Sequence, residues 1–401
     1  MSGPLEGIKV LEFAEHGFVP SGAAALADWG ADVVKLEKPE GDALRSVMAQ
    51  GLVEKTGDFD YVVEISNRNK RNVCLDLRVP EGRELFDRLV AWADVFITNQ
   101  LPKVLRKYRV EPGDVFAVNP RIVYARGHGQ GTRGPDAEAG GFDGVSYWAR
   151  AGIAHMLTAP GSPLVGSRPG FGDFPSGLHL AGGIAAALVK MLRTGMGMTV
   201  DVSLLAAGIW QLAPDIAATS YLGHAPRKTD TAKVLASPLV ASYLTADERH
   251  LQLVMLEERR YWPNLCRALG LEHLVEHPDY ATPEKRHENR VELYDVFREA
   301  IRGEPLEHWL PRLAREGCVF AKFSTPEEVL VDPQVEANGY LMAHPLYPGA
   351  RIPATPQQFD SRPSELRRPA PKKGEHTDEV LREIGLAQAE IAKLREVQAV
   401  R

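Results

Sequence analysis

The chain has 401 residues, of which 44% are hydrophobic and 25% are charged, and its formal net charge is -6 at pH 7. This composition is typical of a folded, water-soluble protein that is large enough for two domains. The acidic balance gives no reason to expect a nucleic-acid partner. The first residues lack the profile of a signal peptide, and no run of about eighteen apolar residues indicates a membrane span, so we expect a cytoplasmic protein.

The three cysteines, Cys74, Cys266 and Cys318, lie far apart and form no CxxC pair. We expect reduced, buried thiols rather than a disulfide framework or a zinc site. The twelve histidines include no HExxH motif, so the sequence predicts no metal site.

Strands and helices alternate through the first third of the chain. Residues 8–13 predict a buried strand, residues 21–30 an Ala-rich helix, and residues 31–37 a second strand. Such a unit predicts parallel strands with a right-handed crossover. The turn after the first strand contains no GxGxxG motif, so a dinucleotide site of the usual kind is not indicated.

The alternation continues along the chain. Further strands are predicted at 72–77, 94–99 and 121–129, with helices at 80–93 and near 104–108. The predicted fold class is therefore α/β, with a Rossmann-like, doubly wound parallel sheet. In such sheets ligands bind at the carboxyl ends of the strands.

The stretch 167–205 contains an acid in an unusual setting. Asp173 follows glycine and phenylalanine residues, and Ser176 is expected to cap a helix that ends at Gly195, before a strand at 199–205. Asp173 would then lie one turn ahead of a helix N-terminus, which favours its ionised form. It either stabilises the helix, by about 0.3 to 1 kcal/mol, or acts as a general base, metal ligand or nucleophile.

The rest of the chain predicts a second domain. A helix around 206–220 is followed by an exposed linker at 223–237. Residues 238–322 predict a small α+β domain, with one hairpin and three amphipathic helices. Residues 323–401 are expected to return to the large domain, which residues 1–222 begin.

Basic residues gather at the ends of the predicted strands. Together they would suit the phosphates of a nucleotide-like ligand, although a solvated surface is the better explanation for any one of them. They are Lys35, Lys38, Arg45, Lys70, Arg71, Arg78, Lys107 and Arg126.

Six segments occur in a specific order along the chain: PLEGIKVLEF, ALADWGADVVKLEKPEGDALR, NRNKRNVCLDL, ADVFITN, GDFPSGLHLAGGIAAAL and RTGMGMTVDVSLL. With them the sequence resembles the class III CoA-transferase family, which includes formyl-CoA transferase and carnitine CoA-transferase and is related to the α-methylacyl-CoA racemases. The resemblance covers nearly the whole chain. It implies an enzyme that moves CoA from an acyl-CoA to a carboxylic acid, with coenzyme A as substrate and no tightly bound cofactor.

The resemblance also implies site residues. The aspartate of the family's GD-x-x-S-G motif is a nucleophile, and Asp173 occupies that position. Asp173 would form an acyl anhydride and then an aspartyl-CoA thioester. Family members form homodimers in which the two chains thread through each other as interlocked rings.

Nine positions match the family's CoA contacts. Lys38, Arg78 and Lys107 would bind the phosphates, and Leu75 and Tyr108 would lie beside the adenine. The full set is His16, Phe18, Lys38, Leu75, Arg78, Asn99, Gln100, Lys107 and Tyr108.

Two departures from the family pattern bear on function. Residues 228–240 lack the glycine run that closes over the site in formyl-CoA transferase. Phe142 stands where the racemases carry a catalytic histidine, whereas Asp143 is retained. Because a racemase needs a proton-transfer group on each face of the carbon, Phe142 argues against racemisation. Asp143 either assists the carboxylates or caps a helix. The alternatives are a racemase or isomerase of the same family and a non-catalytic CoA-binding protein.

Overall fold

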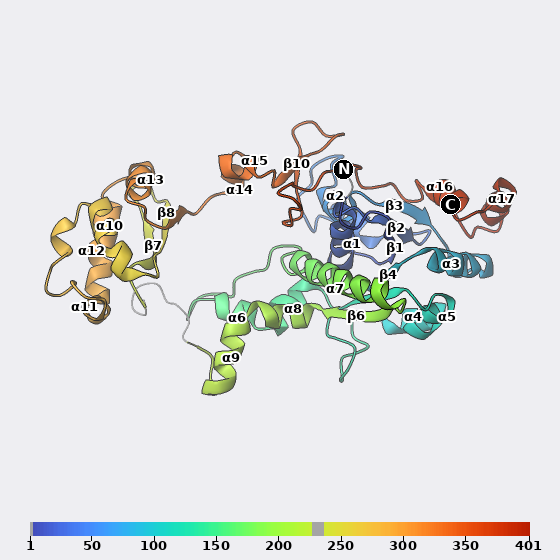
Figure 1. The fold of residues 1–401 in the computed structure, drawn as a ribbon, viewed down its shortest axis with the longest axis horizontal. Coiled ribbons are helices and arrows are strands. Elements are labelled where there is room, and N and C mark those ends of the chain that lie inside the picture. The colour runs from blue at the N-terminus through green and yellow to red at the C-terminus, as the bar shows by residue number, and fades with distance from the viewer. Residues whose placement is uncertain (1–2, 227–235) are drawn as a thin grey trace. The chain divides into compact units, whose positions relative to one another are not determined.

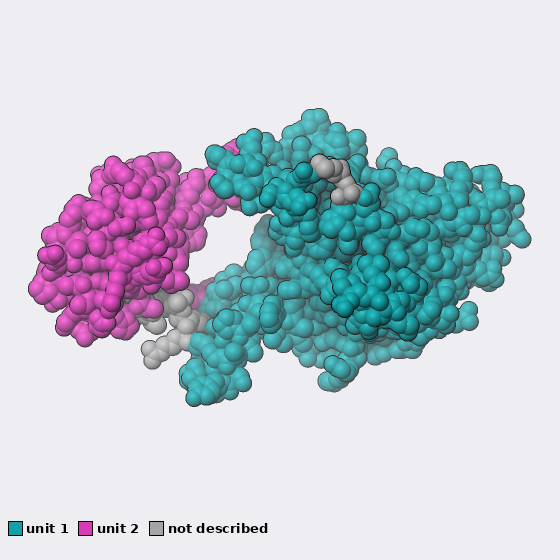
Figure 2. All heavy atoms as spheres, viewed as in Figure 1, with its two compact units in different colours: residues 1–158, 164–226, 333–401 teal, residues 159–163, 227–332 magenta. Residues whose placement is uncertain are grey.

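The computed structural model describes residues 3–226 and 236–401, which form two compact units (Figures 1 and 2). Unit 1 comprises Met1–Thr158, Leu164–Pro226 and Pro333–Arg401. Unit 2 comprises Ala159–Pro163 and Arg227–Asp332. The C-terminal segment is thus part of unit 1, which holds the large sheet.

Unit 1 is built on a six-stranded parallel sheet of order β3-β2-β1-β4-β5-β6. The strand order reverses between β1 and β4, which is where doubly wound sheets bind their ligands. The predicted α/β fold class is confirmed. The strands are β1 (Lys9–Phe13), β2 (Asp32–Glu37), β3 (Arg71–Cys74), β4 (Val95–Thr98), β5 (Val123–His128) and β6 (Met198–Ser203).

Helices cover both faces of this sheet. Alternate strand residues point to opposite faces, so Val10 belongs to one apolar core and its neighbour Leu11 to the other. Helices α1 (Phe18–Asp28) and α7 (Asp173–Thr194) pack on the first face. Helices α3 (Pro80–Trp92), α5 (Pro112–Val118), α16 (Thr377–Glu383) and α17 (Gln388–Glu396) pack on the second.

Shorter elements complete unit 1. They are η1 (Ala43–Ser46), α2 (Tyr61–Asn67), α4 (Pro102–Tyr108), the π-helix η2 (Asp143–Arg150), α6 (Ile153–Leu157), α8 (Leu204–Gln211), α9 (Ala213–Leu222), α15 (Pro333–Ala337), and the antiparallel pair β10 (Leu341–Ala343) and β11 (Arg351–Pro353).

Helices α1 and α7 pack against each other on the first face of the sheet. A Cβ on Gly22 would lie 2.7 Å from the Gly177 carbonyl oxygen, so the two backbones approach closely. By length and composition α7 passes as a membrane span, but buried helices of water-soluble proteins pass the same test, and 44% of its most apolar window is buried. The close approach brings both helix N-termini together.

The predicted start of α7 is wrong by four residues. The helix begins at Asp173, with Gly172 as its N-cap and no capping side chain. Ser176, the predicted cap, lies inside the first turn, and its buried Oγ has no hydrogen-bond partner among the described residues. Asp173 is therefore the first residue of the helix and not one turn ahead of it.

Unit 2 has its own core. Its sheet joins the predicted hairpin, β7 (Val240–Leu244) and β8 (His250–Val254), to β9 (Phe320–Lys322). Helices pack on this sheet through an apolar cluster that includes Trp262 and Phe297. The helices of unit 2 are α10 (Glu258–Leu269), η3 (Glu272–Leu274), α11 (Pro283–Glu288), α12 (Arg290–Arg302), α13 (Leu306–Arg315) and α14 (Pro326–Leu330). The predicted linker at 223–237 and the segment 228–240 fall largely on residues 227–235, outside the described part.

Candidate active site

A cleft of about 310 Å³ opens at the carboxyl ends of β1, β4 and β5, and we call it the Asp173 cleft. Its position matches the ligand site expected at the switch in strand order. Five of the predicted site residues line it together with Phe142 and with glycines from the loop after β5. The five are His16, Phe18, Asn99, Gln100 and Asp173.

The Asp173 carboxyl group has an unusual electrostatic environment. Burial, together with the nearby Asp143 carboxylate, raises the pKa of Asp173 to about 7. The partial positive charges at the N-termini of α1 and α7 act in the opposite sense. A carboxylate with a raised pKa is a stronger base and nucleophile than an ordinary one, so this site suits acyl chemistry.

The second acid, Asp143, is the first residue of the π-helix η2. Its Oδ1 accepts a hydrogen bond from the Gly144 N–H at 2.6 Å, and its buried Oδ2 has no hydrogen-bond partner among the described residues. Residues 143–150 adopt π geometry, which is rare and often occurs at functional sites. Asp143 therefore presents one unsatisfied oxygen close to Asp173.

Gly17 lies directly against the Asp173 side chain. A Cβ at position 17 would lie 2.5 Å from the Asp173 Oδ2 atom, closer than any real Cβ contact. Only glycine therefore lets the backbone before α1 approach the carboxylate this closely. Gly17 contributes to the burial of Asp173, and the half-exposed Phe171 ring packs edge-on against Trp148.

A second cleft, of about 230 Å³, adjoins the first and shares Glu15, Gln100 and Val104 with it. The other predicted CoA contacts line this adjoining cleft. They are Lys38, Leu75, Arg78, Lys107 and Tyr108. The structure thus brings all nine predicted CoA contacts to two joined clefts, and their binding of CoA stays a prediction.

The cations of the adjoining cleft differ in how they are paired. Lys38 bonds Glu15 at 2.9 Å, and Arg78 bonds both Asp76 and Glu40. The Lys107 ammonium lies 5.1 Å from the Tyr108 ring centroid, and no carboxylate pairs with it among the described residues. Lys107 is therefore the cation most available to a phosphate.

Several basic residues that we considered as phosphate contacts are paired inside the protein instead. Lys35 and Lys70 are fully buried and bind Glu12, and Arg71 binds Asp32 and two glutamates of α16. They do not follow strands, since Lys35 lies within β2, Lys70 precedes β3 and Arg71 begins it. Sequence periodicity alone does not distinguish a buried cation from an exposed one.

Two cleft residues were missed by the sequence analysis. Glu15 lines both clefts, and His128 at the end of β5 bonds Asp201 at 3.2 Å. Although burial raises the pKa of Asp201, hydrogen bonds from His128 and Arg126 hold it at about 2. Both missed residues lie at the carboxyl ends of strands, and this position was the signal that could have identified them. Within residues 3–226 and 236–401, no group of three or more metal-ligating side chains occurs.

Comparisons with known proteins agree with this geometry. The model of CoA-transferase family III matches residues 5–377. The chain is 30% identical to (R)-2-hydroxy-4-methylpentanoate CoA-transferase of Clostridioides difficile, over 99% of both chains. It is 30% identical to cinnamoyl-CoA:phenyllactate CoA-transferase of Clostridium sporogenes, over 97% of this chain and 95% of the relative.

A solved structure shares the fold. The crystal structure of a CaiB/BaiF family protein from Brucella suis superposes with a TM-score of 0.82 at 29% identity, covering 96% of this chain and 100% of that one. Together with the match to the family model, this establishes the relationship over nearly the full length. The chain belongs to CoA-transferase family III and is an enzyme that transfers CoA, with CoA thioesters and carboxylates as its substrates.

Proposed function

We propose that this enzyme transfers CoA through covalent intermediates on Asp173. The observation that carries the proposal is the Asp173 carboxylate, which lines the cleft beside a second acid with its pKa raised to about 7. Ionised above that pH and partly desolvated, it is poised to attack a thioester carbonyl.

The proposed reaction has four steps. An Asp173 oxygen attacks the donor thioester carbonyl, the C–S bond breaks, and a mixed anhydride and CoA thiolate form. The thiolate attacks the Asp173 carbonyl carbon, which gives an aspartyl-CoA thioester and releases the donor acid. The acceptor carboxylate attacks this thioester, expelling thiolate and forming a second anhydride. The thiolate then attacks the acceptor's acyl carbon, which releases the new acyl-CoA and restores Asp173.

Neighbouring groups support this assignment. The N-terminal N–H groups of α1 begin at Gly17, against the carboxylate, and suit the developing oxyanions. Asp143 keeps the pKa of Asp173 high. In the adjoining cleft, Lys107 and Arg78 would bind the CoA phosphates, and Leu75 and Tyr108 would pack beside the adenine.

Trapping tests the proposal. Wild-type enzyme incubated with acyl-CoA and hydroxylamine, or with borohydride, should be modified at Asp173 and lose activity. The racemase alternative predicts instead that the α-proton of the acyl group exchanges in deuterium oxide with no CoA exchange between acids. An unmodified and fully active enzyme would contradict the nucleophile.

We also propose a homodimer of the interlocked type. Helix α9 buries none of its residues, and its Tyr221 is 92% exposed. Trp210 of the preceding helix, α8, is 70% exposed. Unpartnered apolar side chains at this density are typical of a surface that a second subunit covers. Light scattering at micromolar concentration should give twice the chain mass of 44.1 kDa, and a monomeric mass would refute the dimer.

A further inference from the structure

Four charged side chains are buried together beneath the start of α1, and we call them the ion network: Glu12, Lys35, Asp42 and Lys70. Their side chains are 0% or 1% exposed. The Lys35 ammonium forms ion pairs with Glu12 Oε1 at 3.0 Å and Asp42 Oδ2 at 2.9 Å, and the Lys70 ammonium forms one with Glu12 Oε2 at 2.6 Å. The two positive and two negative charges balance.

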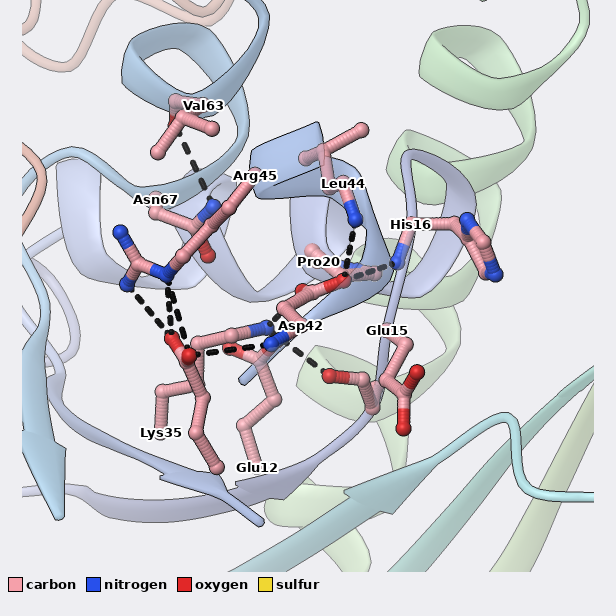
Figure 3. Close-up of polar contacts among 12 residues, drawn as sticks. Glu12, Glu15, His16, Pro20, Lys35, Asp42, Leu44, Arg45, Val63 and Asn67 are labelled. Atoms are coloured by element: carbon pink, nitrogen blue, oxygen red, sulfur yellow. Dashed lines mark hydrogen bonds and ion pairs between the residues drawn. The ribbon is translucent and has the colours of Figure 1, made fainter. Parts of the chain in front are cut away.

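The network also holds main-chain atoms, as Figure 3 shows for several of its bonds. Lys35 donates to the Ala14 carbonyl at 2.8 Å, and Lys70 donates to the Pro20 carbonyl at 2.9 Å. Asp42 Oδ1 accepts the His16 N–H at 3.1 Å. Ala14 and His16 belong to the β1–α1 connection, residues 14–17, and Pro20 lies in the first turn of α1.

The connection is held from its other side as well. The Asn99 side chain accepts the Glu15 N–H at 3.0 Å and donates to the Glu15 carbonyl at 2.6 Å. Asn99, predicted to contact CoA, therefore uses its amide to clamp the backbone. Three successive residues of a loop are thus bonded through their main chain to side chains from other strands and loops.

His16 has a φ of +66°, in the left-handed region that residues other than glycine rarely adopt. Such a conformation persists only where the surroundings impose it, and it is concentrated at functional sites. The next residue is Gly17, whose backbone meets the Asp173 carboxylate. The left-handed conformation of His16 therefore places the backbone of Gly17 against the Asp173 carboxylate.

Stability alone does not account for the ion network, because well-packed apolar residues often replace buried ion pairs without loss of stability. We propose that Glu12, Lys35, Asp42 and Lys70 are positioning residues, which hold the β1–α1 connection against Asp173 and so set the geometry of acyl transfer. This inference rests on the proposed function of Asp173.

The variant Asp42→Asn tests it. Asp42 Oδ1 already accepts the His16 and Leu44 N–H groups, so the new amide nitrogen must face the Lys35 ammonium, donor against donor. We expect kcat to fall about 10- to 100-fold, with KM for acyl-CoA changed less than about threefold, because small misplacements weaken catalysis more than binding. Hydrogen exchange of residues 14–20 should accelerate in parallel.

The matched control is Asp28→Asn at the opposite end of α1. Asp28 is fully buried and bonds Arg68 at 2.7 Å, so its loss also breaks a buried pair. This variant should retain the wild-type kcat and the wild-type rates of hydrogen exchange in residues 14–20. Equal loss of kcat in both variants, or wild-type kcat in Asp42→Asn, would overturn the proposal.

Two further measurements keep the test decisive if Asp42→Asn does not fold. Lys70→Met releases the Pro20 carbonyl and should lower kcat less than Asp42→Asn. In wild-type enzyme the His16 amide should exchange as slowly as core amides, and exchange at ordinary loop rates would overturn the proposal. Trapping at Asp173 separates the positioning role from the proposed function. If acyl-CoA labels Asp173 in the wild-type enzyme and Asp42→Asn keeps wild-type kcat, only the positioning role is overturned.

Discussion

Two groups of buried charge lie on either side of the β1–α1 connection, and they are built on opposite principles. In the ion network, two ammonium groups face two carboxylates, and each ammonium nitrogen has three oxygen atoms within 3.2 Å, although the contacts to Glu12 Oε2 and Asp42 Oδ2 are ion pairs without hydrogen-bond geometry. At the cleft, Asp143 and Asp173 are like charges, and one oxygen of Asp143 is unsatisfied. The balanced group suits rigidity, and the unbalanced one suits reactivity.

The titration of these groups reflects the same contrast. Burial alone lowers the pKa of Lys35, but Glu12 and Asp42 more than offset this and raise it. Lys70 faces a single carboxylate, and burial lowers its pKa to about 8. At Asp173 burial and the like charge act together, so no counter-ion opposes the upward shift in pKa. A counter-ion beside Asp173 would make it a weaker nucleophile.

The largest expected effect comes from removing the proposed nucleophile, Asp173. Asp173→Asn should lower kcat about 1,000-fold or more, because loss of a covalent step leaves only binding and orientation. The control is Glu81→Gln, which neutralises another acid in the first turn of a helix. The kcat of both variants is measured as the rate of CoA exchange between labelled acids. Similar small losses of kcat in the two variants would indicate that Asp173 only stabilises its helix.

The unpaired cation of the adjoining cleft gives the next largest effect. Lys107→Ala should raise KM for acyl-CoA about 10-fold with little change in kcat, because a charge-assisted phosphate bond lost in ground and transition states alike is uniform binding. Arg106→Ala, which removes a neighbouring cation paired with Glu138, is the control. Steady-state kinetics with varied acyl-CoA separates the two constants. A fall in kcat alone would place Lys107 in the chemistry instead.

The like-charge pair itself can be broken by Asp143→Asn. Wild-type activity should rise from pH 6 to pH 8 as Asp173 ionises, with an apparent pKa near 7. Without the Asp143 charge this acidic limb should move to lower pH, so the variant keeps more of its maximal rate at pH 6. The pH profile of kcat/KM measures the shift. An unmoved limb would show that burial alone sets the pKa of Asp173.

The smallest effect concerns stability. Because the pKa of Asp173 is raised in the folded state, the fold favours its protonated form, and this contribution is lost as pH rises towards and through 7. Asp173→Asn should therefore gain stability over wild type on going from pH 5 to pH 8, by about 2 to 3 kcal/mol. Urea unfolding at both pH values measures this. A difference that does not grow with pH would contradict the shift.

The parallel sheet of unit 1 and the hairpin of unit 2 were predictable from the sequence, because apolar runs and alternating apolar and polar residues reflect burial directly. The start of α7 was not, since capping rules favour Ser176 and the helix instead begins at Asp173 without a capping side chain. The resemblance identified Asp173, but its contact with Gly17 joins distant parts of the chain. Nor does any local pattern reveal that Lys35 and Lys70 are buried around Glu12.

The most direct test of the central claim follows oxygen atoms. In a single turnover with an acceptor acid labelled with oxygen-18 in its carboxylate, the second anhydride is cleaved at the acceptor's acyl carbon, which leaves one labelled oxygen on Asp173. Mass spectrometry of the peptide that contains Asp173 should find this label in wild-type enzyme. Label confined to the substrates and products, with none on Asp173 while CoA is transferred, would contradict the covalent mechanism.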